Sequence, residues 1–313
     1  MATLVLTHAD VARHLDGLYL LADLREAFRN DSLARNVQPQ RARAVLPGGG
    51  VVAAFPGSLP GIPAFSVRLE TRFPGQEPSE RDYIQLFDLL TGDLLGVMEA
   101  GHLTAMRTAV VGALAADVLA RPDATRVALI GAGPQASRHL KCLRLVRSLQ
   151  HVRVFDPDPA LATTFSLRMF STLSLPTHAA SSVREAVEDA DIVITTGAAR
   201  EGPLLPQLVR PGTHVTLGTD DPSRVGVTNE LLERAAFFSD SRVLAQASGA
   251  FPENTLRAEL GEVIANTRSG RTSPEEITVF AGLGLPFQDL AAAWQVYQAA
   301  RQDEDIHPVE MDD

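Results

Sequence analysis

The chain has 313 residues, more than one hydrophobic core usually organises, so two domains are expected. Hydrophobic residues make up 45% of the chain and charged residues 21%, a balance that is typical of a globular protein and excludes a disordered or fibrous one. The net charge of −10 and the lack of a basic run argue against partners such as nucleic acid or an anionic membrane surface.

Three features bear on the compartment in which the protein works. The first ten residues have no basic leader, and Asp10 interrupts their short apolar run, which is unlike a signal peptide. The longest apolar stretch, residues 109–120, contains Asp117 and is shorter than the roughly 20 residues that a membrane span needs. Cys142 is the only cysteine, as is usual in a reducing compartment. We therefore expect a cytoplasmic protein without a membrane span.

The first part of the chain has the patterns of helices followed by a sheet. Apolar residues recur at helical spacing over His8–Asp31, which predicts one or two amphipathic helices. A long helix is predicted over Leu103–Ala120, and Pro122 ends it and marks a domain boundary. Between these helices, short β-like runs separated by Pro- and Gly-rich turns predict an antiparallel or mixed sheet with strands at Val51–Phe55, Ser66–Phe73, Tyr83–Asp88 and Leu94–Glu99.

Beyond Pro122 the pattern changes to an alternation of strands and helices. Such βαβ alternation predicts a parallel sheet that helices cover on its faces. The predicted elements are strand Arg126–Ile130, helix Pro134–Leu149, strand His151–Phe155, helix Pro159–Phe170, helix Val183–Glu188, strand Ile192–Thr196 and strand His214–Leu217.

A glycine-rich motif lies between the first predicted strand and helix of this region. The segment Gly131-Ala-Gly133-Pro134-Gln135-Ala136 reads GxGxxA, a pattern typical of the dinucleotide-binding turn of a Rossmann fold. The first glycine would allow a tight turn, the second would let the backbone approach a diphosphate, and Ala136 would let helix and strand pack closely. An ordinary glycine turn in an α/β protein is the alternative. The flanking strand and helix favour dinucleotide binding.

The acidic residue at the end of the next strand indicates which dinucleotide would bind. Asp156 stands where a carboxylate accepts hydrogen bonds from the adenosine ribose hydroxyls. Residues 157–162 contain no Arg or Lys that could pair with a 2′-phosphate. The sequence therefore predicts NAD rather than NADP as the cofactor.

Several short blocks occur in an order that is typical of one protein family. They are Pro39-Gln-Arg41, Phe73-Pro-Gly75, the hairpin Leu86–Gly92, the helix start Leu103-Thr-Ala-Met-Arg107-Thr108-Ala109, Glu259–Ile264, and Thr278–Ala292. Together with the glycine motif, these blocks resemble the ornithine cyclodeaminase/mu-crystallin family over nearly the whole chain. This family also contains alanine dehydrogenases and ketimine reductases, so the resemblance does not specify one reaction.

The resemblance implies hydride transfer between the nicotinamide and Cα of an amino acid or imine. Arg41 and Arg107 match two arginines that bind the substrate carboxylate in the family, and a planar guanidinium suits bidentate carboxylate recognition. Asp220 matches the family's catalytic aspartate. Arg43 competes with Arg41 for its role, and Asp221 competes with Asp220. Each residue also has a purely structural alternative. Arg107 could be a solvated helix residue, Arg41 a loop charge, and Asp220 a helix-cap or turn aspartate.

The resemblance also implies softer contacts to the cofactor. Thr196 would end a strand that faces the dinucleotide, Leu283 would lie near the nicotinamide, and Thr108 would reach the phosphates. Packing alone is an alternative for each. The eight histidines form no HxxxH or HxH pair, so the sequence predicts no metal site.

The chain departs from the family at the position of its catalytic lysine, which is Arg68 here. The only lysine, Lys141, lies on the helix after the glycine motif and cannot replace it. Arginine can donate hydrogen bonds and hold positive charge near an imine, but it does not give up its proton. Arg68 is thus a candidate catalytic residue whose presence reflects either a tolerated replacement or altered chemistry. The segment between Asp220 and Glu230 is also longer than in the family.

The expected fold class is α/β, with a doubly wound Rossmann sheet and a second, α+β domain. The resemblance implies that residues 1–118 bind the substrate and form a homodimer, that residues 119–289 bind NAD, and that residues 290–313 return to the first domain. Three functions fit: an ornithine cyclodeaminase that converts ornithine to proline and ammonia, an amino-acid dehydrogenase or ketimine reductase, and a weakly catalytic ligand-binding protein like mu-crystallin. The expected partner in each case is a small amino or imino acid.

Overall fold

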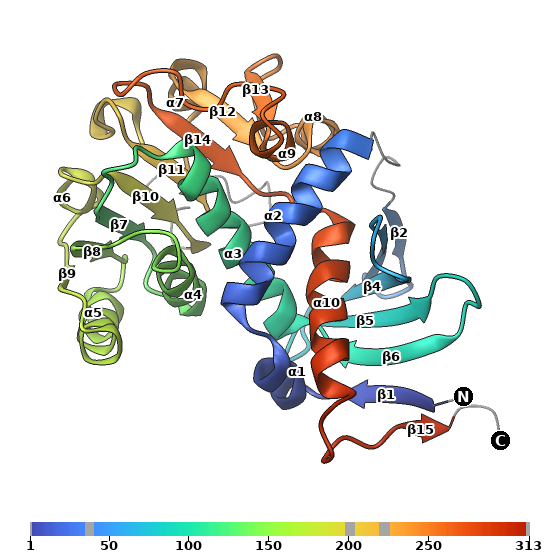
Figure 1. Cartoon of the computed structure of the whole chain (residues 1–313). Helices are drawn as coiled ribbons and strands as arrows, with labels where there is room; N and C mark the ends of the chain where they lie inside the picture. The colour runs from blue at the N-terminus through green and yellow to red at the C-terminus, as the bar shows by residue number, and fades with distance from the viewer. Residues whose placement is uncertain (1, 35–40, 198–203, 219–225, 311–313) are drawn as a thin grey trace. The chain divides into compact units, whose positions relative to one another are not determined.

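The protein consists of two compact units (Figure 1). Unit 1 comprises Met1–Arg107 and Gly284–Asp313, and unit 2 comprises Thr108–Leu283. The division falls inside helix α3 (Gly101–Leu119), whereas the turn at Pro122 predicts a boundary after this helix. The computed structural model of the chain describes residues 2–34, 41–197, 204–218 and 226–310.

Unit 1 is built on a mixed seven-stranded sheet in the order β15-β1-β6-β5-β4-β3-β2. Strands β1 and β6 pair in parallel, and the other neighbours pair antiparallel. The predicted mixed sheet is therefore confirmed, with additional strands at both ends of the unit. The strands are β1 (Ala2–Leu6), β2 (Ala42–Val45), β3 (Val51–Ser58), β4 (Ala64–Arg72), β5 (Glu80–Asp88), β6 (Leu94–Glu99) and β15 (Val309–Glu310).

Helices from both ends of the chain complete unit 1. They are α1 (His8–His14), α2 (Gly17–Ala34) and α10 (Pro286–Ala300). Helix α10 packs against β3, β4 and β5 and runs beside α2 (Figure 1). The rings of Phe28 on α2 and Phe287 on α10 meet edge to face, with centroids 5.2 Å apart. The C-terminal helix is thus part of the same core as the N-terminal helices.

Helix α3 is the most apolar long helix of the described chain. By length and composition it could cross a membrane, but 61% of its apolar window is buried inside the protein. Its one carboxylate in the apolar stretch, Asp117, pairs with Arg147. This burial is what the core helix of a soluble protein shows.

Unit 2 contains an eight-stranded sheet in the order β13-β12-β14-β11-β10-β7-β8-β9, and every neighbouring pair is parallel. The chain builds one half from β7 outward through β8 and β9, and then returns to β10 on the other side of β7. A crevice outside the carboxyl ends of the strands is expected at this reversal, where Rossmann folds bind dinucleotides. The strands are β7 (Arg126–Ile130), β8 (His151–Phe155), β9 (Thr177–Ala179), β10 (Ile192–Thr195), β11 (His214–Leu217), β12 (Ala236–Ser239), β13 (Leu256–Glu259) and β14 (Thr278–Ala281).

Short helices connect these strands: α4 (Pro134–Leu143), α5 (Pro159–Leu173), α6 (Val183–Val187), the 3₁₀ helix η2 (Pro206–Leu208), α7 (Asn229–Arg234), α8 (Arg242–Ser248) and α9 (Leu260–Ile264). Helix α4 ends at Leu143, earlier than the predicted Leu149. The following residues form turns, and the side chain of Arg147 binds Asp117 and the carbonyl oxygens of Ala116 and Asp117 on α3. These tertiary contacts hold Arg147 outside the helix, which explains the difference.

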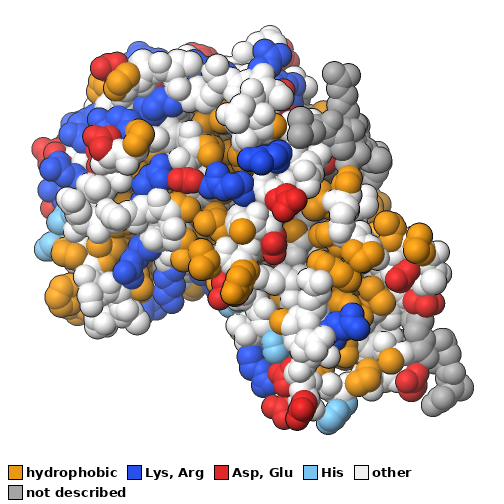
Figure 2. Space-filling view, viewed as in Figure 1, with side chains coloured by type: hydrophobic (Ala, Val, Ile, Leu, Met, Phe, Trp, Pro, Cys, Tyr) orange, Lys and Arg blue, Asp and Glu red, His pale blue; other side chains and the backbone are white. Residues whose placement is uncertain are grey.

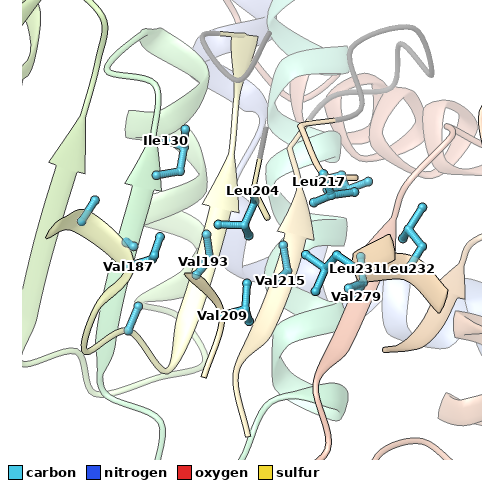
Figure 3. Close-up of a cluster of buried hydrophobic side chains, with 14 of the residues drawn as sticks. Ile130, Val187, Val193, Leu204, Val209, Val215, Leu217, Leu231, Leu232 and Val279 are labelled. Atoms are coloured by element: carbon cyan, nitrogen blue, oxygen red, sulfur yellow. The ribbon is translucent and has the colours of Figure 1, made fainter. Parts of the chain in front are cut away.

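The core of unit 2 covers both faces of its sheet. Successive residues of a strand point to opposite faces, so Ala128 and Ile130 join one buried cluster and Val127 and Leu129 join the other. Figure 3 shows aliphatic side chains of the first cluster, contributed by neighbouring parallel strands and the segments that cover them. A sheet buried on both faces is typical of the doubly wound α/β class. The predicted fold class is confirmed.

Candidate functional site

The loop after β7 carries the first glycine of the predicted motif. Gly131 has a φ of 111°, a conformation that residues with a side chain rarely adopt. A Cβ on Gly131 would overlap Thr196 Oγ1. The Gly131 N–H donates to the carbonyl oxygen of Phe155 at 2.7 Å. The tight turn between β7 and α4 therefore requires glycine at this position.

The second glycine of the motif has no such requirement. Gly133 is the N-cap of α4 and has an ordinary φ of −76°. A Cβ on Gly133 would have no atom within 4 Å of it. Pro134 opens the helix, and Ala136 is fully buried in the core. The open space at a helix N-terminus fits the close approach of a diphosphate, which the N–H groups there would bind.

Asp156 lies beside this loop, at the end of β8. Its Oδ2 accepts a hydrogen bond from the Ala132 N–H at 2.8 Å, and its Oδ1 accepts one from the Asp158 N–H at 3.0 Å. The two backbone contacts fix the carboxylate next to the glycine loop. Its place at the tip of the second strand is the one from which a Rossmann fold reaches the adenosine ribose.

Two further predicted cofactor residues, Thr196 and Leu283, follow strands of the same sheet. Thr196 is buried, and its N–H donates to the Ile130 carbonyl at 2.7 Å, which places it next to the glycine loop. Leu283 follows β14, and two strands, β11 and β10, lie between β14 and β7 in the sheet. The Leu283 N–H donates to Asp240 Oδ1 at 2.9 Å. Thr108 is half-buried on α3, and Gln135 is half-buried in the first turn of α4. The structure brings Thr196 to the loop, and contacts of the others with the cofactor stay predictions.

A buried histidine lies on α4, the helix that follows the glycine loop. The ring of His139, on α4, lies between Gly112 and Gly218, and a Cβ on either glycine would come within 3 Å of it. Complete burial lowers the pKa of His139 to about 4, so the imidazole is neutral at pH 7. Gly218 follows β11 and precedes the segment that contains Asp220 and its rival Asp221. Both aspartates lie outside the described residues, and the catalytic role of Asp220 stays a prediction.

In unit 1, two predicted site arginines meet one carboxylate. Arg68 on β4 is 6% exposed and Arg107 on α3 is 2% exposed. The Arg107 Nε donates to Asp289 Oδ1 at 2.9 Å, and the Arg68 Nε lies 3.3 Å from Asp289 Oδ2. Asp289 comes from α10 and is itself buried. A buried carboxylate between two buried guanidiniums compensates part of the cost of desolvating all three.

Further groups hold the Arg68 side chain in place. Its Nη1 donates to Thr104 Oγ1 at 3.3 Å, and its Nη atoms lie 3.5 Å from Glu70 Oε2 and 3.6 Å from Asp82 Oδ2. The guanidinium carbon sits 4.5 Å from the centroid of the Phe55 ring, in cation–π geometry. Arg68 is therefore a fixed positive charge rather than a group poised to release a proton.

Arg41 reaches the same region of unit 1. Its guanidinium carbon lies 5.3 Å from the centroid of the Phe55 ring, and its Nη2 donates to the Gly284 carbonyl at 3.0 Å. A Cβ on Gly284 would lie 2.9 Å from Arg107 Nη2, so this glycine stands between Arg41 and Arg107. Arg43, the alternative to Arg41, is exposed on β2. The structure thus gathers Arg41, Arg68 and Arg107, and we call them the arginine cluster.

Comparison with known proteins finds relatives along the whole chain. The sequence profile of the ornithine cyclodeaminase/mu-crystallin family matches residues 1–304. The chain belongs to this family. The resemblance that the ordered motifs indicate is thereby confirmed.

The relatives include enzymes and solved complexes. Ketimine reductase mu-crystallin of Mus musculus is 34% identical over 275 residues, which cover 83% of this chain and 85% of that protein. An archaeal alanine dehydrogenase dimer solved with bound NAD is 28% identical and superimposes over the full length of both chains with a TM-score of 0.90. The Δ1-pyrroline-2-carboxylate reductase of Thermococcus litoralis, solved with NADH and L-proline, is 26% identical, with a TM-score of 0.85 over 99% of this chain and 100% of that one.

The family motifs did not identify the acidic side chains around Arg68. Asp289 lies in one of the blocks that carry the resemblance, and Glu70 follows Arg68 by two positions on the same face of β4, so both left a signal in the sequence. Asp82 left none, because its place opposite Glu70 depends on the register of β4 and β5. These three carboxylates balance the charge of the arginine cluster.

Another charged region lies at the opposite edge of the unit 2 sheet, before β7, β10 and β11. Here the ion pair between Arg121 and Asp191 is 2.7 Å long, and Asp191 also accepts the N–H groups of Thr125 and Arg126. On the face shown in Figure 2, Lys and Arg side chains are mixed with Asp and Glu. No group of three or more potential metal ligands occurs among the described residues. The region around Arg121 and Asp191 has the contacts of a structural ion-pair network. It surrounds an open hollow of about 450 Å³ lined by Arg121, Asp123, Thr125, Arg126, Asp191, Arg210 and Pro211.

Proposed function

We propose that this chain is an NAD(H)-dependent enzyme that transfers hydride to or from Cα of a small amino or imino acid. The observation that carries the proposal is that one chain holds a glycine loop with Asp156 in unit 2 and a cluster of three arginines in unit 1. The first suits a dinucleotide and the second suits a carboxylate. The relatives solved with NAD, and with NADH and L-proline, support both assignments.

The residues of unit 2 fit NAD(H), which when bound would accept or supply the hydride at its nicotinamide ring. The space above Gly133 and the N-terminus of α4 would receive the diphosphate. Asp156 would accept hydrogen bonds from the ribose hydroxyls while it keeps its own contacts to the loop. Thr196 would line the path of the dinucleotide along the edge of the sheet.

The residues of unit 1 would bind and orient the substrate. Arg41 and Arg107 would hold its carboxylate, since their guanidiniums converge on Gly284, which has no side chain. Arg68 would stand as a fixed positive charge near the reacting carbon. Because Arg68 keeps its proton, exchange of a proton at the substrate nitrogen would fall to Asp220, the residue that the family resemblance assigns to it.

The replacement of the family lysine by Arg68 favours some reactions of the family over others. In imine reduction the carbon gains a hydride and the nitrogen gains at most one proton, which yields the amine. Cyclodeamination must also move protons at a second nitrogen and release ammonia. A site with one titrating group fewer suits the reaction with fewer proton transfers. We therefore favour an imine reductase such as a ketimine reductase, and the relatives named reductase support this choice.

Net turnover of the cofactor tests the proposal. The purified protein is incubated with NADH and cyclic imino acids such as Δ1-pyrroline-2-carboxylate, and with NAD and L-proline, L-alanine or L-ornithine, while NADH absorbance and ammonia are followed. Net consumption or formation of NADH is the expected result. Ammonia release from L-ornithine without a net change in NADH would identify a cyclodeaminase instead. Binding of NADH and imino acids without turnover would identify a ligand-binding protein.

We further propose a homodimer formed through the sheet of unit 1. The face opposite Arg68 and α10 carries half-buried apolar side chains from neighbouring strands, namely Phe65, Val67, Leu69, Phe87 and Val97, and Tyr83 is 44% exposed there. Such patches mark interaction surfaces, and the alanine dehydrogenase relative is a dimer. Light scattering should give twice the chain mass, and Leu69→Glu should give monomers.

A cytoplasmic location is also proposed. Cys142 is buried, and this burial raises the pKa of its thiol to about 12, which makes it an inert thiol rather than a disulfide partner. A protein without disulfides whose substrates are metabolites and NAD(H) suits this compartment. Fractionation of cells that express the full chain would test it, and recovery outside the cytoplasmic fraction would refute it.

A further inference from the structure

Asp289 is the carboxylate around which the arginine cluster is organised. It lies in the first turns of α10, is 3% exposed, and contacts arginines that come from β4 and α3. Two buried guanidiniums this close would repel each other without a negative charge between them. Asp289 supplies that charge, and it binds each arginine through a different oxygen.

The hydrogen bond with Asp289 also determines how the guanidinium of Arg107 is oriented. Asp289 engages Arg107 through Nε, so the terminal nitrogens point elsewhere. Arg107 Nη1 lies 3.4 Å from Gln288 Oε1, and both terminal nitrogens lie within about 3 Å of the place where a Cβ on Gly284 would be. Arg41 donates to the carbonyl oxygen of Gly284. The side of Arg107 that can bind a carboxylate bidentately is thus directed toward Arg41.

We propose that Asp289 is the positioning residue of the substrate-carboxylate site. By accepting the hydrogen bond from Nε of Arg107 it fixes the direction of the terminal nitrogens. As the counter-ion of Arg68, 3.3 Å from its Nε, it keeps the second guanidinium beside the first. It acts through these arginines and need not touch the substrate. The inference rests on the proposed function, because it assigns a carboxylate to the arginine cluster.

A change at Asp289 should therefore affect the substrate and spare the cofactor. Asp289→Asn keeps the size of the side chain and removes its charge. The expected result is a KM for the amino or imino acid that rises at least about 10-fold, with a smaller change in kcat and a Kd for NAD within about 2-fold of wild type. Asp289→Glu keeps the charge but moves it by one methylene, so its KM should lie between those of wild type and Asp289→Asn.

Asp303→Asn is the matched control. Asp303 also contacts two basic side chains, Arg13 and His14, but these belong to α1. Asp303 follows the C-terminal end of α10, whereas Asp289 lies near its N-terminal end. Its replacement removes a bridging carboxylate of the same type from unit 1. The KM, kcat and NAD affinity of Asp303→Asn should remain those of the wild type.

A double-mutant cycle separates positioning from a general effect on folding. If Asp289 acts through Arg107, the KM increase caused by Asp289→Asn should largely disappear when Arg107→Gln is already present. Additive increases in the double variant would overturn the proposal, as would an unchanged KM in folded Asp289→Asn. If Asp289→Asn does not fold, the KM of Asp289→Glu tests the proposal by itself. A KM of Asp289→Glu equal to that of the wild type would also overturn the proposal. Failure of the proposed function gives a different result from failure of the role of Asp289. In that case the wild-type protein neither converts nor binds L-alanine or L-proline.

Discussion

The glycine loop of unit 2 and the arginine cluster of unit 1 are built in different ways. The loop is local, because residues 131–136 and Asp156 supply its turn, its helix start and its carboxylate within one βαβ unit. The cluster joins Arg68 on β4 and Arg107 on α3 with Arg41, and its counter-ion Asp289 comes from α10. The contact between Arg107 and Asp289 spans 182 positions. A short motif can encode the proposed dinucleotide site, whereas the proposed substrate site depends on the tertiary fold.

The two regions also differ in how many charged groups they contain and in how deeply these groups are buried. The loop consists of neutral backbone with one partly exposed carboxylate that backbone N–H groups stabilise. In the cluster, Arg68 and Arg107 are buried among carboxylates, and removing either arginine leaves the carboxylates unbalanced. Substitutions in the loop should therefore separate binding from stability, and substitutions in the cluster should couple them.

The largest effect is expected at Gly133. Gly133→Val should lower NAD affinity on the order of 1,000-fold, about 4 kcal/mol, because its side chain would fill the space that the diphosphate needs. The fold should remain intact, since no atom lies within 4 Å of the new Cβ. Calorimetric titration and thermal unfolding measure the two effects. Unchanged NAD affinity would place the phosphates elsewhere.

Gly131→Ala is the contrasting variant at the same loop. Its Cβ would meet Thr196 Oγ1, and its positive φ would be strained, so it should lower the melting temperature as well as NAD affinity. A fully stable Gly131→Ala would show that the two glycines do not differ in the way that their surroundings indicate.

The sequence predicted the loop because its signals lie next to one another. Gly131, Gly133 and Ala136 follow an apolar strand directly, and Asp156 ends the next one. For the cluster, the family blocks pointed to Arg41, Arg68 and Arg107, but not to their acidic neighbours. Periodicity cannot show that Asp82 faces Glu70 or that α10 returns Asp289 to β4, since both depend on pairing between distant segments.

Element boundaries show the same division. The strand at His151–Phe155 was predictable from its β-branched and apolar residues, and the structure has it at the same bounds. The end of α4 was not, because Arg147 is held by Asp117 on another helix. Short strands such as β12 and β14 have apolar runs too brief to be distinguished from buried helix or loop by period.

The next largest effect concerns the cluster. Arg68→Ala should lower turnover on the order of 100-fold, about 3 kcal/mol, because a fixed positive charge near the reacting carbon is lost. Its NAD affinity should barely change. The melting temperature should also fall, since Glu70, Asp82 and Asp289 would lose a shared cation. Steady-state kinetics on amino and imino acids and thermal unfolding would measure these effects.

The turnover of Arg68→Lys distinguishes a tolerated replacement of the family lysine from an adaptation to the substrate. If Arg68 is a tolerated replacement of the family lysine, Arg68→Lys should raise turnover, because an amine in a partly desolvated site can exchange protons near neutral pH. If Arg68 is adapted to its substrate, for instance to a second carboxylate, Arg68→Lys should lower it. Equal rates for wild type, Arg68→Lys and Arg68→Ala would mean that Arg68 lies outside the reaction site.

Acid should destabilise the protein through two buried histidines of unit 2. Burial lowers the pKa of His139 to about 4 and that of His214 to about 3, from 6.5. Below pH 6.5 the unfolded chain takes up these protons while the folded chain does not, so stability falls as the pH falls toward 4. At pH 5 each histidine should cost about 2 kcal/mol relative to pH 7.

Denaturant unfolding at pH 7 and pH 5 would measure this loss. His139→Gln removes one of the titrating groups, and its stability should fall less between the two pH values than that of the wild type. The control is His8→Gln, which replaces an exposed histidine of unit 1. Identical pH dependence in wild type and His139→Gln would show that this histidine is not buried in its neutral form.

The smallest effect that we expect is the choice between the two nicotinamide dinucleotides. NAD(H) should bind at least ~10-fold more tightly than NADP(H), a difference of ~1.4 kcal/mol, because the Asp156 carboxylate would repel a 2′-phosphate and residues 157–162 offer no cation to bind it. Asp156→Asn sharpens the test, since an amide oxygen can still accept from the Ala132 N–H while the negative charge is gone. This variant should therefore narrow the preference, mainly by gaining affinity for NADP(H) rather than by losing the loop. Calorimetric titration of both dinucleotides against wild type and variant would measure it. NADP(H) binding by the wild type that is as tight as NAD(H) binding, or tighter, would contradict the role of Asp156. It would also argue against the view that one short motif predicts the dinucleotide specificity of this protein.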